Sequence, residues 1–147
     1  KNADAYEPDL AMSYNNAGNF YSDQGQPDKA EKYYLSAIEI RERLVEKSAY
    51  AYEPDLATSY NNAGIFYKDQ GQPEKAEKYF LDAIEIRERL VKKNAAVYEP
   101  DLAISCFLFS LNSKDKTYLD RAYEIAKRRQ DDPRCGKLMK DIESMLK

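Results

Sequence analysis

The chain has 147 residues, with 23 lysines and arginines, 26 aspartates and glutamates and no histidine, so its formal net charge is −3. This length suits one compact domain, and the near balance of charge argues against nucleic acid or a membrane as the main partner. Histidine is the commonest general base and metal ligand, so its absence favours a protein without catalytic site, metal or cofactor.

The dominant feature of the chain is an internal repeat. The segment Tyr6–Ala11 recurs 46 residues later as Tyr52–Ala57, and after another 46 residues as Tyr98–Ala103. Between 5–50 and 51–96, 37 of 46 positions are identical. A fixed period of this size indicates a stack of similar units, each of which buries one face against its neighbour.

The first helix of each unit is predicted to begin at a proline. Proline fits the first position of a helix, where the N–H that Pro8 lacks would be unpaired anyway. Small and apolar residues then follow at the spacing of one helical face, namely Leu10, Tyr14, Ala17, Gly18 and Tyr21. We interpret the tyrosines as core residues with their hydroxyls near the surface.

A turn and a second helix complete each unit. Gly25 is predicted to supply the turn, and Pro27 to restart the chain as a helix that continues to about Lys47. Gly18 and Ala30 remove side-chain bulk from facing positions, which allows tight antiparallel packing of the two helices. The predicted fold class is therefore all-α, built from helix hairpins.

These residues resemble the tetratricopeptide repeat signature, which runs aromatic, small residue and glycine, tyrosine, glycine, alanine, aromatic, alanine. The first unit matches it at Tyr14, Ala17, Gly18, Tyr21, Gly25, Ala30, Tyr34 and Ala37, and the second at Tyr60, Ala63, Gly64, Tyr67, Gly71, Ala76, Phe80 and Ala83. The period of 46 residues is longer than that of the standard unit, and the proline that usually ends the second helix is absent. In both respects the chain is similar to the repeats of kinesin light chains and related bacterial proteins. The resemblance implies a solenoid, a right-handed α–α superhelix of antiparallel hairpins.

The two ends of the array differ. We expect one domain over 1–147, with repeats at 5–50 and 51–96, a divergent repeat at 97–130 and a C-terminal capping helix at 132–147. The final helix carries apolar residues on one face, so it either caps the array or docks in a groove as a ligand. These residues are Leu138, Ile142, Met145 and Leu146.

The N-terminal end aligns with the tail of a repeat, because Lys1–Ala3 matches Lys93–Ala95. We therefore expect an earlier unit to precede this chain in a longer array. Without that neighbour, the first helix pair is expected to expose apolar surface, which would favour self-association.

The resemblance implies that the first helices of successive units line a concave face, which binds a peptide or helical segment of a protein partner. The predicted contacts are Asn15, Asn19, Asn61, Asn62, Ile65, Lys68, Phe107 and Leu111. Asparagine is a poor helix former, so adjacent asparagines in mid-helix need a compensating role. We expect Asn15, Asn19 and Asn61 to contact solvent or ligand. For Asn16 and Asn62, a contact between helices of the scaffold is an equal alternative.

A carboxylate clamp, which in some members of the family holds the C-terminal acid of chaperone tails, is not expected. The corresponding third-unit positions are the apolar Ile104 and Leu108, and Asn15 stands where lysine would be needed. Lys68 and Lys114 are basic residues at the edge of the predicted groove, and a solvated lysine is the simpler interpretation of each.

Three further expectations concern the class of protein. Acidic and basic residues on the second helices are interpreted as surface ion pairs rather than catalytic groups, namely Glu39, Glu42, Glu85, Glu88, Arg41, Arg43, Arg87 and Arg89. Cys106 and Cys135 lack the paired spacing of a zinc site, so we expect free thiols and a cytoplasmic protein. The alternative to a binding scaffold is a structural or self-associating spacer within a larger signalling or enzyme protein.

Overall fold

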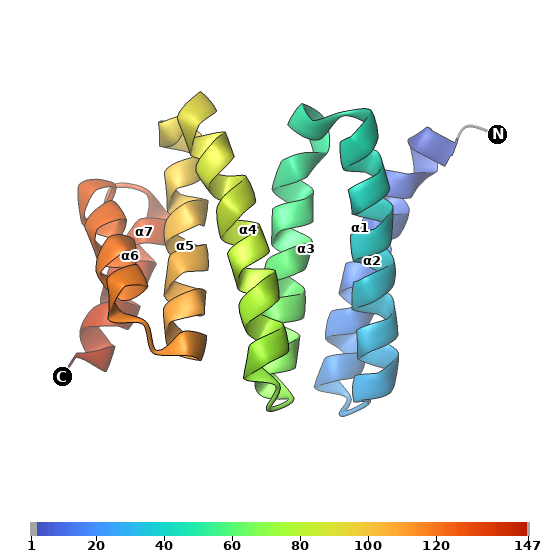
Figure 1. Ribbon diagram of the computed structural model, residues 1–147, viewed down its shortest axis with the longest axis horizontal. Coiled ribbons are helices and arrows are strands. Elements are labelled where there is room, and N and C mark those ends of the chain that lie inside the picture. The colour runs from blue at the N-terminus through green and yellow to red at the C-terminus, as the bar shows by residue number, and fades with distance from the viewer. Residues whose placement is uncertain (1–2, 147) are drawn as a thin grey trace. The chain divides into compact units, whose positions relative to one another are not determined.

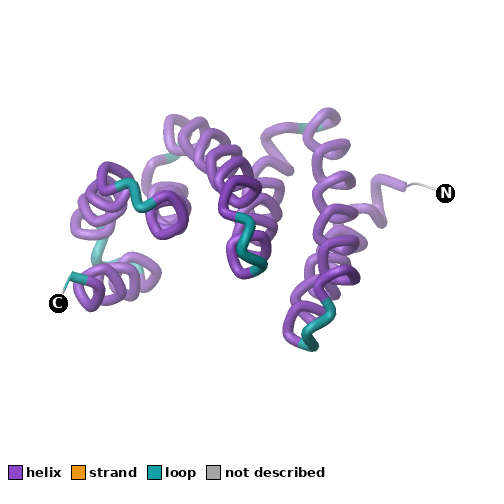
Figure 2. Tube along the Cα trace, turned by 60° about the horizontal axis from the view of Figure 1, so that its bottom comes forward, coloured by secondary structure: helices purple, strands orange, loops and turns teal. Residues whose placement is uncertain are grey.

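The computed structural model describes the backbone of residues 3–146 and the side chains of residues 5–146. Every element in this part of the chain is a helix, as Figures 1 and 2 show. The helices are α1 (Ala3–Asp23), α2 (Pro27–Lys47), α3 (Ala49–Asp69), α4 (Pro73–Lys93), α5 (Ala95–Ser113), α6 (Lys116–Arg128) and α7 (Pro133–Met145). The all-α prediction is confirmed.

The helices form two compact units, Lys1–Tyr79 and Phe80–Lys147, and the boundary falls within α4. The first unit contains α1, α2, α3 and the start of α4, and the second contains the rest of α4 with α5, α6 and α7. The alignment of Lys1 and Asn2 with the tail of a repeat lies outside the described residues, as does Lys147.

The prediction that the first helix begins at Pro8 is wrong. The helix α1 starts at Ala3, and α3 and α5 likewise contain the equivalent prolines. A proline near the start of a helix removes one backbone hydrogen bond, and the helix continues through it in all three units. Of the residues before these prolines, Tyr52 packs against the buried cluster of Ala11, Ile40 and Leu44, whereas Tyr6 is 61% exposed.

The turns between the first and second helices are those that the glycines predicted. Gly25 has a φ of 71°, in the left-handed region where glycine is favoured. The N–H of Gln26 donates to the carbonyl of Tyr21 at 2.9 Å, and that of Gly25 donates to Ser22 at 3.1 Å. This pattern satisfies the last carbonyls of α1. Gly71 repeats the turn after α3 with a φ of 74°.

Close approach of α1 and α2 depends on Gly18. A β-carbon at this position would lie 2.7 Å from two ring carbons of Tyr34, which is closer than such atoms can pack. Beside it, the ring of Tyr33 lies 5.5 Å from that of Tyr21 and 5.6 Å from that of Tyr14 between centroids. The predicted role of the glycine is therefore confirmed for this hairpin. Of the tyrosines predicted as core residues, Tyr34 is buried, whereas Tyr14 and Tyr21 are half-buried.

A buried arginine joins α2 to α3. The Nη1 of Arg41 donates to the carbonyl of Asp55 at 3.2 Å and to the Oγ of Ser59 at 2.8 Å. Seven residues before Arg41 on α2, the ring of Tyr34 packs against the ring of Phe66, with the two ring centroids 5.4 Å apart. Polar and aromatic contacts thus both specify how the two helices meet.

The second unit contains the same arginine contact. The Nη1 of Arg87 donates to the carbonyl of Asp101 at 3.1 Å and to the Oγ of Ser105 at 2.7 Å. The interpretation of Arg41 and Arg87 as surface ion-pairing residues is therefore wrong. Both are buried, and burial lowers the pKa of each guanidinium. Their long side chains reach backbone and hydroxyl oxygens of the next helix.

The last helix packs against α6 and, over fewer residues, against α5, much as α3 packs against α2 and α1. It begins with the carboxylate of Asp132, which accepts from the backbone N–H of Arg134 at 2.9 Å. The apolar face of α7 is buried at Cys135, Leu138 and Ile142. The helix α7 therefore covers the outer side of α6.

Both cysteines are free, as predicted, and both are buried. Burial raises the pKa of the Cys106 thiol to about 11 and also raises that of Cys135. Because the thiolate is the reactive form, neither residue is placed for nucleophilic chemistry.

Candidate functional site

Four of the predicted contact residues lie at accessible positions in the first unit. On α1 Asn19 is exposed, and its Oδ1 accepts from the hydroxyl of Tyr34 at 2.5 Å. On α3 Ile65 and Lys68 are exposed, whereas Asn62 is half-buried. A ligand could reach these side chains without any change in the packing of the helices.

The expected exposure of Asn15 and Asn61 is wrong. Each side chain is only 6% exposed, and the Nδ2 of Asn15 donates to the Oγ of Ser59 at 3.1 Å across the α1–α3 contact. It is instead Asn16 that is exposed. The side chains of neighbouring residues on a helix point about 100° apart. Only one asparagine of an adjacent pair can therefore face the next helix, and the sequence of the pair does not show which one does.

The residue 46 positions after Asn61 is Phe107, in the second unit. Phe107 is half-buried on α5 and lines a cavity of ≈ 280 Å³ between α5 and α7. Apolar side chains form most of the wall of this α5–α7 cavity, and charged ones its rim. The other lining residues are Ile104, Leu108, Leu138, Arg134, Lys137 and Asp141.

The charges at the rim of the α5–α7 cavity are already paired. Arg134 donates to Asp132 at 2.8 Å and to Asp101 at 2.9 Å, and these carboxylates raise its pKa. Lys137 lies 3.1 Å from Asp141. Exposed pairs of this kind are screened by solvent, so the cavity offers apolar contact with little preference for charge.

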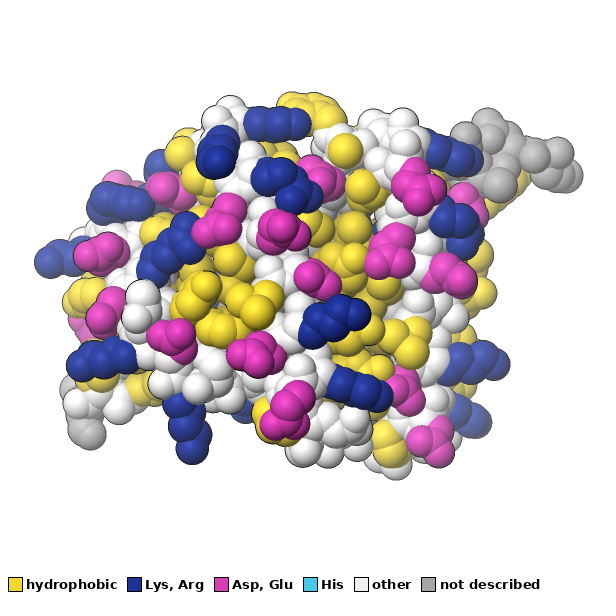
Figure 3. All heavy atoms as spheres, in the orientation of Figure 1, with side chains coloured by type: hydrophobic (Ala, Val, Ile, Leu, Met, Phe, Trp, Pro, Cys, Tyr) yellow, Lys and Arg dark blue, Asp and Glu magenta, His cyan; other side chains and the backbone are white. Residues whose placement is uncertain are grey.

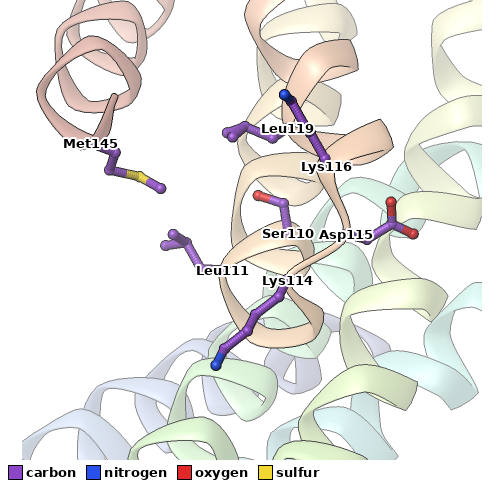
Figure 4. Close-up of a pocket in the computed structure, with 7 residues that line it drawn as sticks. All are labelled: Ser110, Leu111, Lys114, Asp115, Lys116, Leu119 and Met145. Carbon is purple, nitrogen blue, oxygen red and sulfur yellow. The ribbon is translucent and has the colours of Figure 1, made fainter. Parts of the chain in front are cut away.

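Leu111 lines a second cavity, of ≈ 260 Å³, in the same unit. Figure 4 shows Leu111 of α5, Leu119 of α6 and Met145 of α7 around one space, with Met145 directed toward Leu111. The polar lining comes from the end of α5, the α5–α6 turn and the start of α6, and consists of Ser110, Lys114, Asp115 and Lys116. We call this the Leu111 cavity.

The polar rim of the Leu111 cavity has an excess of positive charge. The carboxylate of Asp115 accepts from the N–H of Thr117 at 2.9 Å and so caps α6. The hydroxyl of Ser110 donates to the carbonyl of Phe107 at 2.7 Å. Lys114 and Lys116 are exposed beside them, so an acidic group next to an apolar one would suit this rim.

Several lining residues were not predicted as site residues. Leu138 and Met145 were recognised only as part of the apolar face of the last helix, and Leu119 and Lys116 were not singled out. The apolar spacing of the last helix was visible in the sequence. The shape of each cavity depends on how neighbouring helices pack, and the spacing of residues along one helix does not determine that packing.

Figure 3 shows acidic and basic side chains interspersed over the face drawn, with hydrophobic atoms visible between them. Among the described residues, no group of three or more cysteines, aspartates or glutamates could hold a metal ion. None of the helices in residues 3–146 is long and apolar enough to cross a bilayer.

Residues 9–89 match the family model of the tetratricopeptide repeat, which covers more than half of the chain. The chain belongs to the tetratricopeptide repeat family. No curated protein sequence matches the chain. Ile104 and Leu108 line the apolar α5–α7 cavity. A carboxylate clamp would need basic residues at these two positions.

Among solved structures, the chain is similar to the N-terminal domain of stress-induced protein-1 from C. elegans. The TM-score is 0.57, the sequence identity is 20%, and the match covers 100% of each chain. At this identity the likeness shows that the two share a tetratricopeptide repeat fold, and nothing about a shared ligand.

Proposed function

We propose that this protein is an interaction scaffold that grips an extended or helical segment of a protein partner through an apolar anchor at α5, without catalysis of its own. Tetratricopeptide repeats generally mediate protein–protein interaction. The observation that carries the proposal is that Phe107 and Leu111 each line a mostly apolar cavity on α5, of ≈ 280 and ≈ 260 Å³.

The Leu111 cavity suggests the chemistry of the anchor. A leucine, methionine or phenylalanine side chain fits its size, and burial of one such group contributes about 1.5–3 kcal/mol. Lys114 and Lys116 at the rim favour an aspartate or glutamate next to the anchor in the partner. The ligand that we propose is therefore a segment with an apolar residue flanked by an acidic one.

The accessible residues of the first unit are proposed as separate contacts. A side-chain amide offers a donor and an acceptor together, which suits the backbone of an extended segment. The residues proposed are Asn19, Asn62, Ile65 and Lys68. We also propose that the protein works in the cytoplasm, supported by two cysteines that are free and buried.

Selection of displayed random peptides on the full chain tests the proposal. Selected peptides should share an apolar residue next to an acidic one, and Leu111→Ser should weaken their binding about tenfold or more. Leu81→Ser, at an exposed leucine of α4, is the matched control and should bind normally. Lys114→Glu, which leaves the apolar wall intact, should weaken binding of the acidic peptides alone. Equal binding by Leu111→Ser and Leu81→Ser would overturn the proposal.

A self-associating spacer is the second candidate, and the exposed apolar side chains of Tyr6, Leu10 and Phe20 on α1 favour it. Light scattering at high protein concentration tests it. A monomeric mass would count against pairing through α1. A dimer that Phe20→Ser dissociates would support it.

A further inference from the structure

The second unit contains a pocket between α4, α5 and α6, three helices that are labelled in Figure 1. Its volume is ≈ 300 Å³. The lining residues are Glu88, Val91, Lys92, Leu102 and Arg121. We call this space the Arg121 pocket. The first unit shows what occupies the equivalent place when the repeat is intact.

In the first unit that place holds a tyrosine. The hydroxyl of Tyr60 on α3 donates to the carboxylate of Glu42 on α2 at 2.6 Å, and its ring lies 5.9 Å from the ring of Tyr79 between centroids. The residues 46 positions later are Cys106, Glu88 and Ile125. The second unit therefore keeps the glutamate and replaces both aromatic rings with smaller side chains.

Cys106 lies beside the Arg121 pocket and is fully buried. Its thiol is close enough to Arg121 and Glu88 for both charges to influence its pKa. Leu102, which lines the pocket, precedes Cys106 by about one helical turn. Because a thiol is much smaller than a phenol ring, Cys106 fills only part of the place that Tyr60 fills in the first unit.

The glutamate of the pocket binds an arginine where its counterpart binds a tyrosine. The Nη1 of Arg121 donates to the Oε2 of Glu88 at 2.6 Å, and the two side chains are 40% and 42% exposed. A carboxylate has lone pairs for further donors, and the face of a guanidinium attracts an aromatic ring. This accessible pair therefore offers a tyrosine both an acceptor for its hydroxyl and a surface for its ring.

We propose that the Arg121 pocket binds a tyrosine side chain of a separate protein partner. The ring lies against Leu102 and the guanidinium of Arg121, and the hydroxyl donates to Glu88. Tyrosine is preferred to phenylalanine because only tyrosine offers this donor. Because the pocket shares no lining residue with the α5–α7 cavity or the Leu111 cavity, the inference does not rest on the proposed function.

The rim of the Arg121 pocket carries a lysine where the first unit carries an acid. Lys92 is exposed and replaces Glu46. Two basic residues of the lining, Lys92 and Arg121, thus accompany one acidic residue, Glu88. An acidic residue next to the tyrosine of the partner complements this excess of positive charge.

A second copy of the chain does not offer such a tyrosine. The exposed tyrosines among the described residues are Tyr6 and Tyr50. The acidic neighbour of Tyr6 is Glu7, whose carboxylate already pairs with Arg43 at 2.6 Å. Tyr50 stands between two alanines. The partner is therefore a different protein.

The first probe is p-cresol, which is the tyrosine side chain without its backbone. It is titrated into the full isotope-labelled chain and followed by NMR. Saturable amide shifts are expected around Leu102, Cys106 and Arg121. Because a single ring is buried, the affinity should be on the order of millimolar.

Filling the pocket from within should block the probe. Cys106→Tyr places a ring of the chain itself where Tyr60 stands in the first unit, and it should weaken p-cresol binding about tenfold or more. Cys106→Ala keeps the space and is the matched control, which should bind normally. Thermal unfolding shows whether both variants fold. If Cys106→Tyr does not, Val91→Phe fills the pocket from a half-buried edge, and Val45→Phe, at the identical valine of the first unit, is its control.

A second pair of probes tests the charge at the rim. Acetyl-aspartyl-tyrosine amide should bind at least about twofold more tightly than acetyl-alanyl-tyrosine amide. Lys92→Glu, which restores the charge that the first unit has at Glu46, should reverse this preference.

Four results would overturn the inference. They are the absence of saturable shifts, shifts confined to the Leu111 cavity, equal binding of p-cresol by each filling variant and its control, and equal affinity for the two dipeptides. Loss of the shifts as the chain is concentrated would mean that a second copy fills the pocket, contrary to the inference. Leu111→Ser tests the proposed function and Cys106→Tyr tests this one, so failure of either is distinguishable from failure of the other.

Discussion

The helices α1 and α3 have nearly the same sequence and different surroundings. Leu56, Ser59 and Phe66 on α3 are buried, whereas the same residue types at Leu10, Ser13 and Phe20 of α1 are exposed. Ser59 and Phe66 contact Arg41 and Tyr34 of α2. In a stack of repeats the neighbour decides whether a residue belongs to the core. The comparison therefore supplies matched pairs, in which one residue type is tested in two environments.

The largest difference is expected between the two phenylalanines. Phe66→Ala should lower the free energy of unfolding by about 3–5 kcal/mol, because it leaves a cavity beside Tyr34. Phe20→Ala should lower it by less than about 1 kcal/mol, because more than half of that side chain is in solvent. Urea unfolding of both variants measures the difference, and similar losses would show that α1 and α3 are equally covered.

A glycine on the inner side of α1 sharpens the comparison, because that side is covered even though the outer side is not. Gly18→Ala should destabilise the protein by about 1–3 kcal/mol, since the new β-carbon meets the ring of Tyr34. Gly136→Ala, in α7, meets only the carbonyl of Gln130 at 3.5 Å and should be neutral or stabilise by up to about 1 kcal/mol. Thermal unfolding of both variants is the measurement, and a stable Gly18→Ala would refute the close approach of α1 and α2.

The two serines should differ by a smaller amount. Ser59→Ala removes the shared acceptor of Arg41 and Asn15 and should cost about 1–3 kcal/mol. Ser13→Ala should change the stability by less than about 0.5 kcal/mol, because its hydroxyl lies at an exposed position. Equal effects in chemical denaturation would mean that the arginine contact does not depend on serine.

The smallest effect concerns the C-terminal helix α7, which covers α6. Hydrogen bonds from Arg134 lower the pKa of Asp132 from 3.8 to about 2. Because the pKa is lower in the folded state, the carboxylate stabilises the fold above about pH 4, and this contribution is lost as the pH falls toward 2. A stability profile over this range should be flatter for Asp132→Asn. An unchanged slope would contradict the role of this carboxylate.

Local features of the fold were predictable from the sequence. The turn at Gly25 and the close packing at Gly18 follow from chain geometry within one hairpin. The recurrence of both glycines in the second unit predicts both features. The burial of Asn15 and Arg41 was not predictable in the same way. Each depends on which side of a helix meets the next one, and a rotation of one residue exchanges a surface side chain for a buried one.

The candidate site was predictable to a similar extent. Phe107 stood out because it replaces Asn15 and Asn61 of the earlier units, and Leu111 because it replaces Asn19 of the first unit, where the second unit already has Ile65. The cavities beside them also need Leu119 and Met145, which come from other helices. Their contribution follows from tertiary packing that the helical period does not specify.

The most direct test of the central claim is an NMR titration of the full isotope-labelled chain with a selected peptide that has an apolar residue next to an acidic one. We predict that the largest amide shifts occur around Leu111, Leu119 and Met145, and that Leu111→Ser reduces them at equal peptide concentration. Shifts confined to the outer faces of α2 and α4, or a spectrum that no peptide perturbs, would contradict it.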